Sequence, residues 1–159
     1  MASSRSGGAE QRLRDLGIEL PPPPQPFGAY VESVQSGHLL FLSGMLPVVD
    51  HKPKYVGRLG QELDTESGRD ALRTASLSAL SAARAHLGTL DKVTRVVRLG
   101  IYLATSGDFF DQPKVADAAS ELFESIFGKE KTSVRMVLGV ASLPLGMPVE
   151  LEVILEVAE

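Results

Sequence analysis

The chain has no cysteine among its 159 residues. This absence excludes disulfide bonds, thiolate nucleophiles, and zinc or iron–sulfur sites that use cysteine ligands. The longest run of large apolar residues, 39–42, is far shorter than the roughly 18 to 20 residues that cross a membrane. The opening segment MASSRSGGAE lacks the apolar core of a secretory signal. We therefore expect a soluble, cytoplasmic protein without a membrane partner.

An excess of positive charge is also missing. Sixteen Lys and Arg residues stand against 20 Asp and Glu residues, and the formal net charge is −4. Such a chain has no overall positive field to neutralise phosphates, which argues against a nucleic-acid partner. The hydrophobic share of 43% and the charged share of 23% are ordinary for a globular protein. We expect an N-terminal extension over 1–25, with a short helix and a proline-rich lead-in, and one domain over 26–159.

Local patterns place the elements in the first part of the chain. Leucines and an isoleucine over 11–20 indicate a short docking helix, and the prolines that follow favour an extended segment. Residues 30–36 and 38–43 favour strands, and Gly37 between them suits a hairpin turn. The mixed segment 47–60, which lacks any period, reads as a loop with room to close over a ligand.

Two helical patterns and three strand patterns follow. Apolar residues at three- and four-residue spacing predict a helix over 65–87, capped by Thr65 or Asp64 and stopped by Gly88. A second helix is predicted to begin near Asp111, which can cap it, and to end at Gly128. Alternating residues predict strands over 93–103, 133–141 and 149–157.

The predicted order is β-β-α-β-α-β-β, an α+β fold with two helices on one face of a single mixed sheet. The other face of such a sheet needs cover. Glutamates at alternate positions of the last strand, among them Glu150 and Glu152, make that face partly polar. Both features suit a homo-oligomer, and we expect a closed ring, a homotrimer.

Known catalytic patterns are absent from the sequence. No GxSxG elbow surrounds a serine, which argues against a serine hydrolase. His38, His51 and His86 are scattered without metal-ligand spacing, and we interpret them as structural or solvated. The segment 57–60 has neither phosphate-loop pattern, so loop flexibility explains its glycines. We expect no metal and no cofactor.

Arg135 is the most informative polar residue, because it interrupts an apolar strand. A guanidinium there needs a partner, and its planar fork suits a carboxylate. The partner can be a small carboxylate ligand, or a protein acid such as Glu150, Glu152 or an acid of a neighbouring subunit. The residues alone leave both interpretations open.

Glu150 and Tyr30 are further candidates. A partly buried carboxyl at Glu150 can have a raised pKa and exchange protons with water, although a solvent-facing strand residue is the common alternative. Tyr30 can place a hydroxyl at a pocket rim, although a tyrosine in a core or an interface is the commoner case.

The ordered set of these segments resembles the RidA/YjgF family, also labelled endoribonuclease L-PSP. The resemblance extends from about Leu20 to the end of the chain. Its specific part is the arginine followed fifteen residues later by the first glutamate of VELE. The matching segments are Gly28-Ala29-Tyr30-Val31, Leu42-Ser43-Gly44, Arg135, Leu143-Pro144 and Val149-Glu150-Leu151-Glu152. The segments around 111–115 and 139–146 are similar to the YjgF-like branch.

The resemblance implies a chorismate-mutase-like fold, a homotrimer with pockets between subunits, and cofactor-free hydrolysis of enamines or imines such as 2-aminoacrylate to a keto acid and ammonia. It implies that Arg135 grips the substrate carboxylate and that Glu150 handles the attacking water. Tyr30 and Ser43 match pocket residues. The implied activity is that of a 2-iminobutanoate/2-iminopropanoate deaminase-like hydrolase.

Two positions depart from the family pattern. The chain has Ala116 or Asp117 in place of a pocket asparagine, and Val137 in place of a cysteine. Asp117 is a candidate substrate-binding residue whose charge opposes an anionic substrate unless it is paired. A module that binds a small carboxylate without turnover is therefore the alternative function. Ribonuclease activity is suggested only by the family label, and the acidic composition argues against it.

Overall fold

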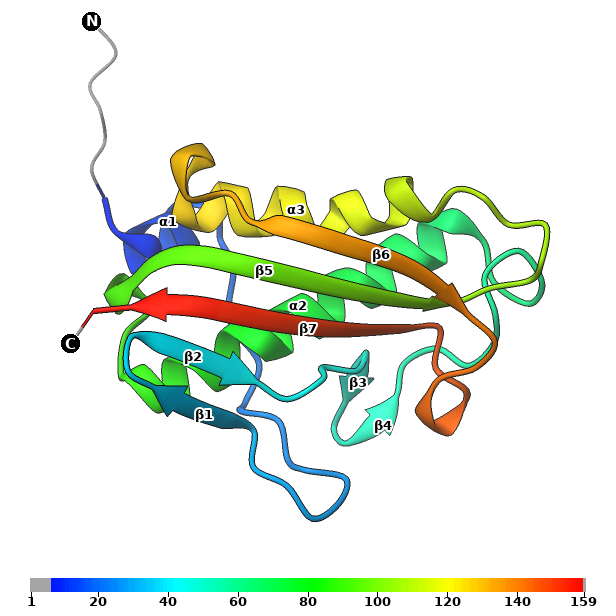
Figure 1. Cartoon of the computed structure of the whole chain (residues 1–159), viewed down its shortest axis with the longest axis horizontal. Helices are drawn as coiled ribbons and strands as arrows, with labels where there is room; N and C mark the ends of the chain where they lie inside the picture. The colour runs from blue at the N-terminus through cyan, green and yellow to red at the C-terminus, as the bar shows by residue number, and fades with distance from the viewer. Residues whose placement is uncertain (1–6, 159) are drawn as a thin grey trace, which may run out of the picture.

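The computed structural model describes residues 7–158, and they form two layers (Figure 1). One layer is a five-stranded sheet with the strand order β1-β2-β7-β5-β6. The other layer consists of helices that lie together behind this sheet. Strand β5 pairs with β6 in parallel, and the other neighbours pair in an antiparallel manner. The predicted α+β fold with one mixed sheet and helices on one face is confirmed.

The helices are α1 (Ala9–Asp15), α2 (Thr65–Leu87) and α3 (Gln112–Phe127), and short 3-10 turns are η1 (Leu90–Lys92), η2 (Lys129–Lys131) and η3 (Pro144–Gly146). The strands of the sheet are β1 (Ser33–Ser36), β2 (Leu39–Leu42), β5 (Val93–Ala104), β6 (Val134–Val140) and β7 (Val149–Val157). A separate small hairpin consists of β3 (Val48–Val49) and β4 (Lys52–Pro53).

Three predicted elements differ from the observed ones. The N-terminal helix covers Ala9–Asp15 instead of 11–20, because Gly17 with a φ of 67° ends the helical path soon after Asp15. The first strand begins at Ser33, so Tyr30 lies in a bend before it. The segment 47–60, predicted as a loop, contains the β3–β4 hairpin. The hairpin was not predicted because the segment has no alternation of apolar residues.

Helix α2 is the centre of the helical layer. The Asp64 side chain caps it by accepting a hydrogen bond from the Ser67 amide at 2.8 Å, and Gly88 ends it with a φ of 82°. Its small residues let the helix approach the sheet closely, as predicted; the fully buried ones include Ala71, Ala75 and Ala83. At α3, Asp111 occupies the predicted N-cap position, but its side chain makes no capping hydrogen bond.

Helix α1 is fixed to the rest of the domain by a reciprocal set of polar contacts. The Glu10 carboxylate accepts two hydrogen bonds from Arg84, at 3.0 and 2.7 Å, and one from the Leu90 amide at 3.0 Å. In return, the Glu10 amide donates to the Asp91 carboxylate at 3.0 Å. Leu13 of the same helix is almost completely buried in the core. The N-terminal helix is therefore part of the packed fold.

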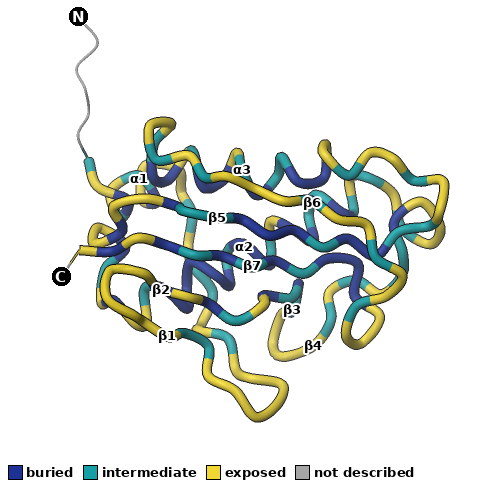
Figure 2. The backbone as a smooth tube through the Cα atoms, in the orientation of Figure 1, coloured by how far each residue is buried: buried dark blue, intermediate teal, exposed yellow. Residues whose placement is uncertain are grey.

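The central strands are buried and the outer strands are exposed (Figure 2). In β7, Val149, Leu151 and Val153 are buried toward the helices, and the residues between them alternate to the other side. Among the described residues, no helix covers that other side, which we call the open face. No helix within 7–158 combines the length and apolarity that crossing a membrane requires.

Candidate functional site

Glu150 is the central acidic residue of the open face. It lies in β7 opposite Tyr102 of β5, between two buried residues that point toward the helices. Gly44 lies directly against it: a Cβ atom on Gly44 would approach the Glu150 Oε1 atom to 2.8 Å. A side chain at position 44 would require the Glu150 carboxyl to move. The half-buried carboxyl group therefore lies against the chain just after β2.

Burial raises the pKa of the Glu150 carboxyl above its usual value, because desolvation disfavours the charged form. A carboxyl with a raised pKa carries its proton to a higher pH than a solvated glutamate does. It can therefore give and take a proton closer to neutral pH, which is what general acid–base chemistry requires. Of the two interpretations that the sequence left open for Glu150, the structure has the partly buried carboxyl.

The hydroxyl groups of Ser43 and Tyr30 organise the loop beside this carboxyl. Ser43 Oγ donates to the Val31 carbonyl at 2.6 Å, and the Ser43 amide donates to the Glu32 carbonyl at 2.9 Å. The Tyr30 hydroxyl accepts a hydrogen bond from the Phe27 amide at 2.9 Å. Tyr30 itself is 43% exposed and lies outside the strand. Both residues shape the segment before β1.

Arg135 does not occupy the environment that the sequence indicated. Most of β6 is exposed within the chain, so the strand is not a buried apolar element. The Arg135 guanidinium lies against α3, where its Nη1 atom donates to Asp117 Oδ1 at 2.8 Å and to Ser120 Oγ at 3.1 Å. Glu150 and Glu152, which the sequence offered as possible protein partners of Arg135, do not pair with it. The register of β6 turns the Arg135 side chain toward the helices instead.

The Arg135–Asp117 pair is open to solvent. The side chains of Arg135 and Asp117 are 30% and 49% exposed. The hydrogen bonds of Arg135 to Asp117 and Ser120 both use the Nη1 atom. No group within residues 7–158 accepts a hydrogen bond from the Nε or Nη2 atom of Arg135. A carboxylate that approaches from solvent can therefore reach part of the guanidinium fork, but it meets the negative charge of Asp117.

Arg135 and Glu150 lie on opposite faces of the sheet in one chain. Arg135 is paired with Leu99, whose side chain is buried beneath the helices, whereas Glu150 is paired with Tyr102 on the open face. Side chains of residues that pair directly point to the same face, and successive residues alternate. A single subunit therefore does not bring the two predicted site residues into one pocket.

Arg98, which the sequence analysis did not single out, lies on the same face of the sheet as Glu150. Arg98 Nε donates to Glu152 Oε1 at 3.1 Å, and both residues belong to the central strands. Gly100 lies beside this pair, since a Cβ atom there would approach Glu152 Oε1 to 3.2 Å. Alternation from Arg98 to Tyr102 along β5 is the signal that could have placed these residues together.

Apolar side chains flank this polar centre on both sides. Val134, Met136 and Leu138 of β6 pair with Arg98, Gly100 and Tyr102 and are 70%, 48% and 44% exposed. On the opposite edge, Val34 and Phe41 pair with each other and are also exposed. Large exposed apolar surfaces on soluble chains mark sites of association. The open face is thus apolar at its edges and polar at its centre.

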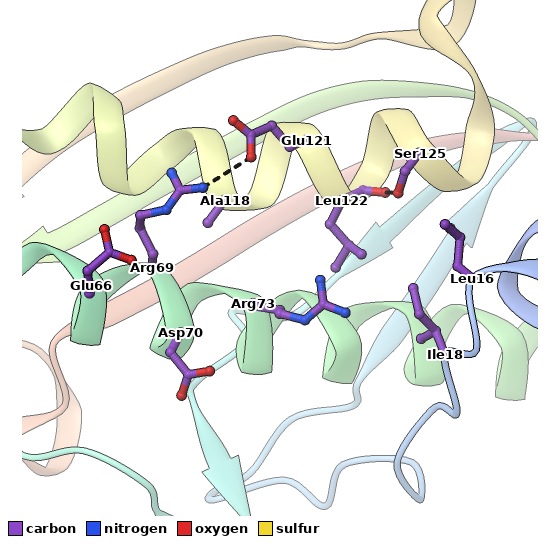
Figure 3. A pocket seen from close by; sticks show the side chains of 10 residues that line it. All are labelled: Leu16, Ile18, Glu66, Arg69, Asp70, Arg73, Ala118, Glu121, Leu122 and Ser125. Atoms are coloured by element: carbon purple, nitrogen blue, oxygen red, sulfur yellow. Dashed lines mark hydrogen bonds and ion pairs between the residues drawn. The ribbon is translucent and has the colours of Figure 1, made fainter.

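The helical layer carries a separate groove between α2 and α3 (Figure 3). Its volume is about 440 Å³, and an ion pair between Arg69 and Glu121 at 3.1 Å crosses it. Arg73 points into the groove toward the side chain of Leu122. None of the five predicted site residues lines this groove.

Asp70, at the edge of the same groove, holds the segment after β4. It accepts a hydrogen bond from the Tyr55 hydroxyl at 2.6 Å and pairs with Lys54 Nζ at 2.7 Å. The hydrogen bond to Asp70 raises the pKa of Tyr55 to about 12, and Lys54 and Tyr55 hold the pKa of Asp70 below its usual value. These contacts fasten the loop over 54–60 to α2.

Comparison with known proteins gives a consistent result. The family model described as "YjgF/chorismate_mutase-like, putative endoribonuclease" matches residues 10–156. The chain is 40% identical to Protein TCP17 of Trypanosoma cruzi over 157 residues, which are 98% of each chain. It is 30% identical to a 2-iminobutanoate/2-iminopropanoate deaminase of Dermatophagoides farinae over 135 residues, 85% of this chain and 91% of the relative.

A solved structure is similar over nearly the whole chain. The crystal structure of Atu1372 from Agrobacterium tumefaciens, a protein of unknown function, superposes with a TM-score of 0.86 at 33% identity. The match covers 94% of this chain and 92% of that one. The two proteins therefore share their fold over nearly the whole chain.

Proposed function

Because the chain belongs to the YjgF/chorismate mutase-like family, we propose that it is a hydrolytic deaminase of small enamine and imine acids, which it converts to keto acids and ammonia. The observation that carries this proposal is the half-buried Glu150 carboxyl on the open face, whose pKa is raised by burial. The deaminase name of one relative supports the same reaction class.

The chemistry needs one group that exchanges a proton. Water adds to the imine carbon while the Glu150 carboxylate takes one of the water protons. Glu150 passes this proton to the nitrogen, which gives a neutral carbinolamine. Glu150 then takes the hydroxyl proton of the carbinolamine and passes it to the same nitrogen, and ammonia leaves with the electrons of the C–N bond as the carbonyl forms. The balance is imine plus water to keto acid plus ammonia. Glu150 is suited to both steps, because burial raises its pKa above that of a solvated glutamate.

The substrate carboxylate is held by Arg135 of a second copy in this proposal. Arg135 and Glu150 face opposite sides of the sheet in one chain, so one pocket can contain both only if two subunits contribute. The exposed apolar edges of the open face, among them Phe41 and Met136, support a homotrimer that covers this face. Ser43 and Tyr30 then position the pocket loop.

A coupled assay tests the activity. Purified protein is added to a serine or threonine dehydratase reaction, and keto acid release is followed. We expect acceleration, which Arg135→Ala and Glu150→Gln abolish. The matched controls Arg69→Ala, whose guanidinium pairs with Glu121 on the helical layer, and Glu156→Gln, at the far end of β7, retain it. No acceleration by the unmodified protein rejects the deaminase.

A complementation experiment tests the shared pocket. The inactive variants Arg135→Ala and Glu150→Gln are mixed in equal amounts, unfolded together and refolded. If each pocket takes Arg135 from one subunit and Glu150 from another, about one pocket in four receives both intact residues by random mixing. Recovery of about a quarter of the activity is expected. No recovery from refolded, assembled mixtures contradicts a pocket between subunits.

The Arg135–Asp117 pair favours a second candidate, a module that binds small carboxylates without turnover. Asp117 already neutralises part of the guanidinium charge, which weakens the grip on an anionic substrate. Calorimetry with keto acids distinguishes the candidates. Saturable binding that Arg135→Ala removes, in a protein without turnover, supports the module.

A further inference from the structure

A second hollow lies away from the proposed site, between the proline segment, the β3–β4 hairpin and α2. Its volume is about 490 Å³, within the usual range of small-molecule pockets. The residues that matter for its chemistry are Glu19, Pro22, Val49, Asp50, His51 and Leu77. It contains none of the five residues assigned to the deaminase site. We call it the proline hollow.

The walls of the proline hollow are fixed by contacts outside it. The ring of His51 stacks on Phe27 with centroids 4.0 Å apart and planes 9° apart. Asp50 and His51 form the hairpin tip in the left-handed conformation, with φ of 52° and 61°. On the other wall, Ser81 Oγ donates to the Pro21 carbonyl at 2.6 Å. The hollow is therefore formed before any ligand enters.

The carboxylates of the hollow are those of Glu19 and Asp50, and they lie among the side chains of Gln25, His51, Thr74 and Ser78. Residues 21–24 are prolines, which have no backbone N–H to donate. The Glu19 and Asp50 carboxylates both line the hollow, and neither has a hydrogen-bond or ion-pair partner within residues 7–158. The nearby Lys54 is already paired with Asp70 at 2.7 Å. The rim therefore carries two carboxylates without a cationic partner in the described part of the chain.

The interior of the hollow is apolar. Leu77 of α2 and Val48 and Val49 of the hairpin line it together with the proline rings. An apolar body with a positively charged donor group satisfies both parts of this surface. We propose that the proline hollow binds a small primary amine with an apolar or aromatic body, its ammonium group between Glu19 and Asp50.

Fluorine NMR tests the proposal with two probes of opposite charge and similar shape. Trifluoromethylbenzylamine is the amine, and trifluoromethylbenzoate is the matched acid. We expect saturable line broadening for the amine and binding at least about tenfold weaker for the acid, because the two rim carboxylates repel it. Equal binding of both probes, or no saturable binding of the amine, overturns the proposal.

Charge-neutralising variants locate the site. Each of Glu19→Gln and Asp50→Asn should weaken amine binding about two- to fivefold, the usual worth of a solvent-exposed ion pair, and the double variant about tenfold. Glu66→Gln removes the same charge from an exposed position of α2 outside the hollow and should leave binding unchanged. An equal loss in Glu66→Gln would show that net charge alone attracts the amine, which also overturns the proposal.

Discussion

Replacing Asp117 by asparagine tests directly whether Arg135 receives a carboxylate. The aspartate lies 2.8 Å from Nη1, so its charge is within about 6 Å of any carboxylate bound to the rest of the guanidinium. At that separation in a solvated site the repulsion is about 1 kcal/mol. Asp117→Asn should therefore tighten keto acid binding roughly fivefold.

The same substitution should barely change folding stability. The side chains of Arg135 and Asp117 are 30% and 49% exposed. Ion pairs with this exposure contribute about 0 to 1 kcal/mol to the free energy of unfolding. Ser120 also keeps its hydrogen bond to Arg135. A change in affinity without a change in melting temperature is thus the signature of relieved repulsion.

Isothermal titration calorimetry with pyruvate or 2-oxobutanoate measures the effect. Glu121→Gln is the matched control, because Glu121 lies on the same helix and pairs with Arg69 instead. The Glu121→Gln variant should bind the keto acid with the same affinity as the unmodified protein. Unchanged or weaker binding in Asp117→Asn would refute the reasoning, since a carboxylate seated at Arg135 must sense the loss of the adjacent charge.

Three further predictions concern protonation. Glu10→Gln should lower the free energy of unfolding by about 1 to 3 kcal/mol at neutral pH. The hydrogen bond from Arg84 lowers the pKa of Glu10, so this stabilisation is present above the unfolded value of 4.5 and is lost as the pH falls below it; denaturant titrations at several pH values measure it. Tyrosine absorbance should show Tyr55 titrating near pH 12, and Asp70→Asn should move it toward 10. Glu150→Gln should stabilise the chain at neutral pH, because the pKa of Glu150 is raised in the folded state and stability is lost as the pH rises above the unfolded value of 4.5 and through the higher folded value.

Each of these predictions has a contradicting outcome. A Glu10→Gln difference that is the same at low and neutral pH would mean that the carboxylate charge plays no part. Tyr55 titrating near 10 in the unmodified protein would mean that its hydroxyl is not bonded to Asp70 in solution. A Glu150→Gln variant that is less stable at neutral pH would mean that the ionised carboxyl has a stabilising partner.

The order of elements could be predicted because it depends on local patterns. The alternation in β7, the small residues of α2 and the stop at Gly88 each follow from the sequence. The start of β1 could not be predicted in the same way. Residues with strand propensity continue back to Tyr30, and the hydrogen bonds of Ser43 to Val31 and Glu32 decide where the bend lies.

The site was harder to predict than the fold. Alternation along β7 places Glu150 on the face opposite the core, but its partial burial depends on neighbours such as Gly44 and could not be predicted from the strand alone. The partner of Arg135 could not be predicted either, because the parallel register of β5 and β6 decides which side of the sheet the guanidinium occupies. The Arg98–Glu152 pair was missed because it joins two strands that are 54 residues apart in sequence.

The central position of β7 has a consequence for how the molecule is made. The nine residues of this strand lie between β2 and β5, yet they follow the other strands of the sheet in sequence. During synthesis, the β1–β2 hairpin and the β5–β6 pair must wait as separate pieces until β7 leaves the ribosome. A ribosome that stops before Val149 releases two half-sheets with exposed edges, a product prone to aggregation.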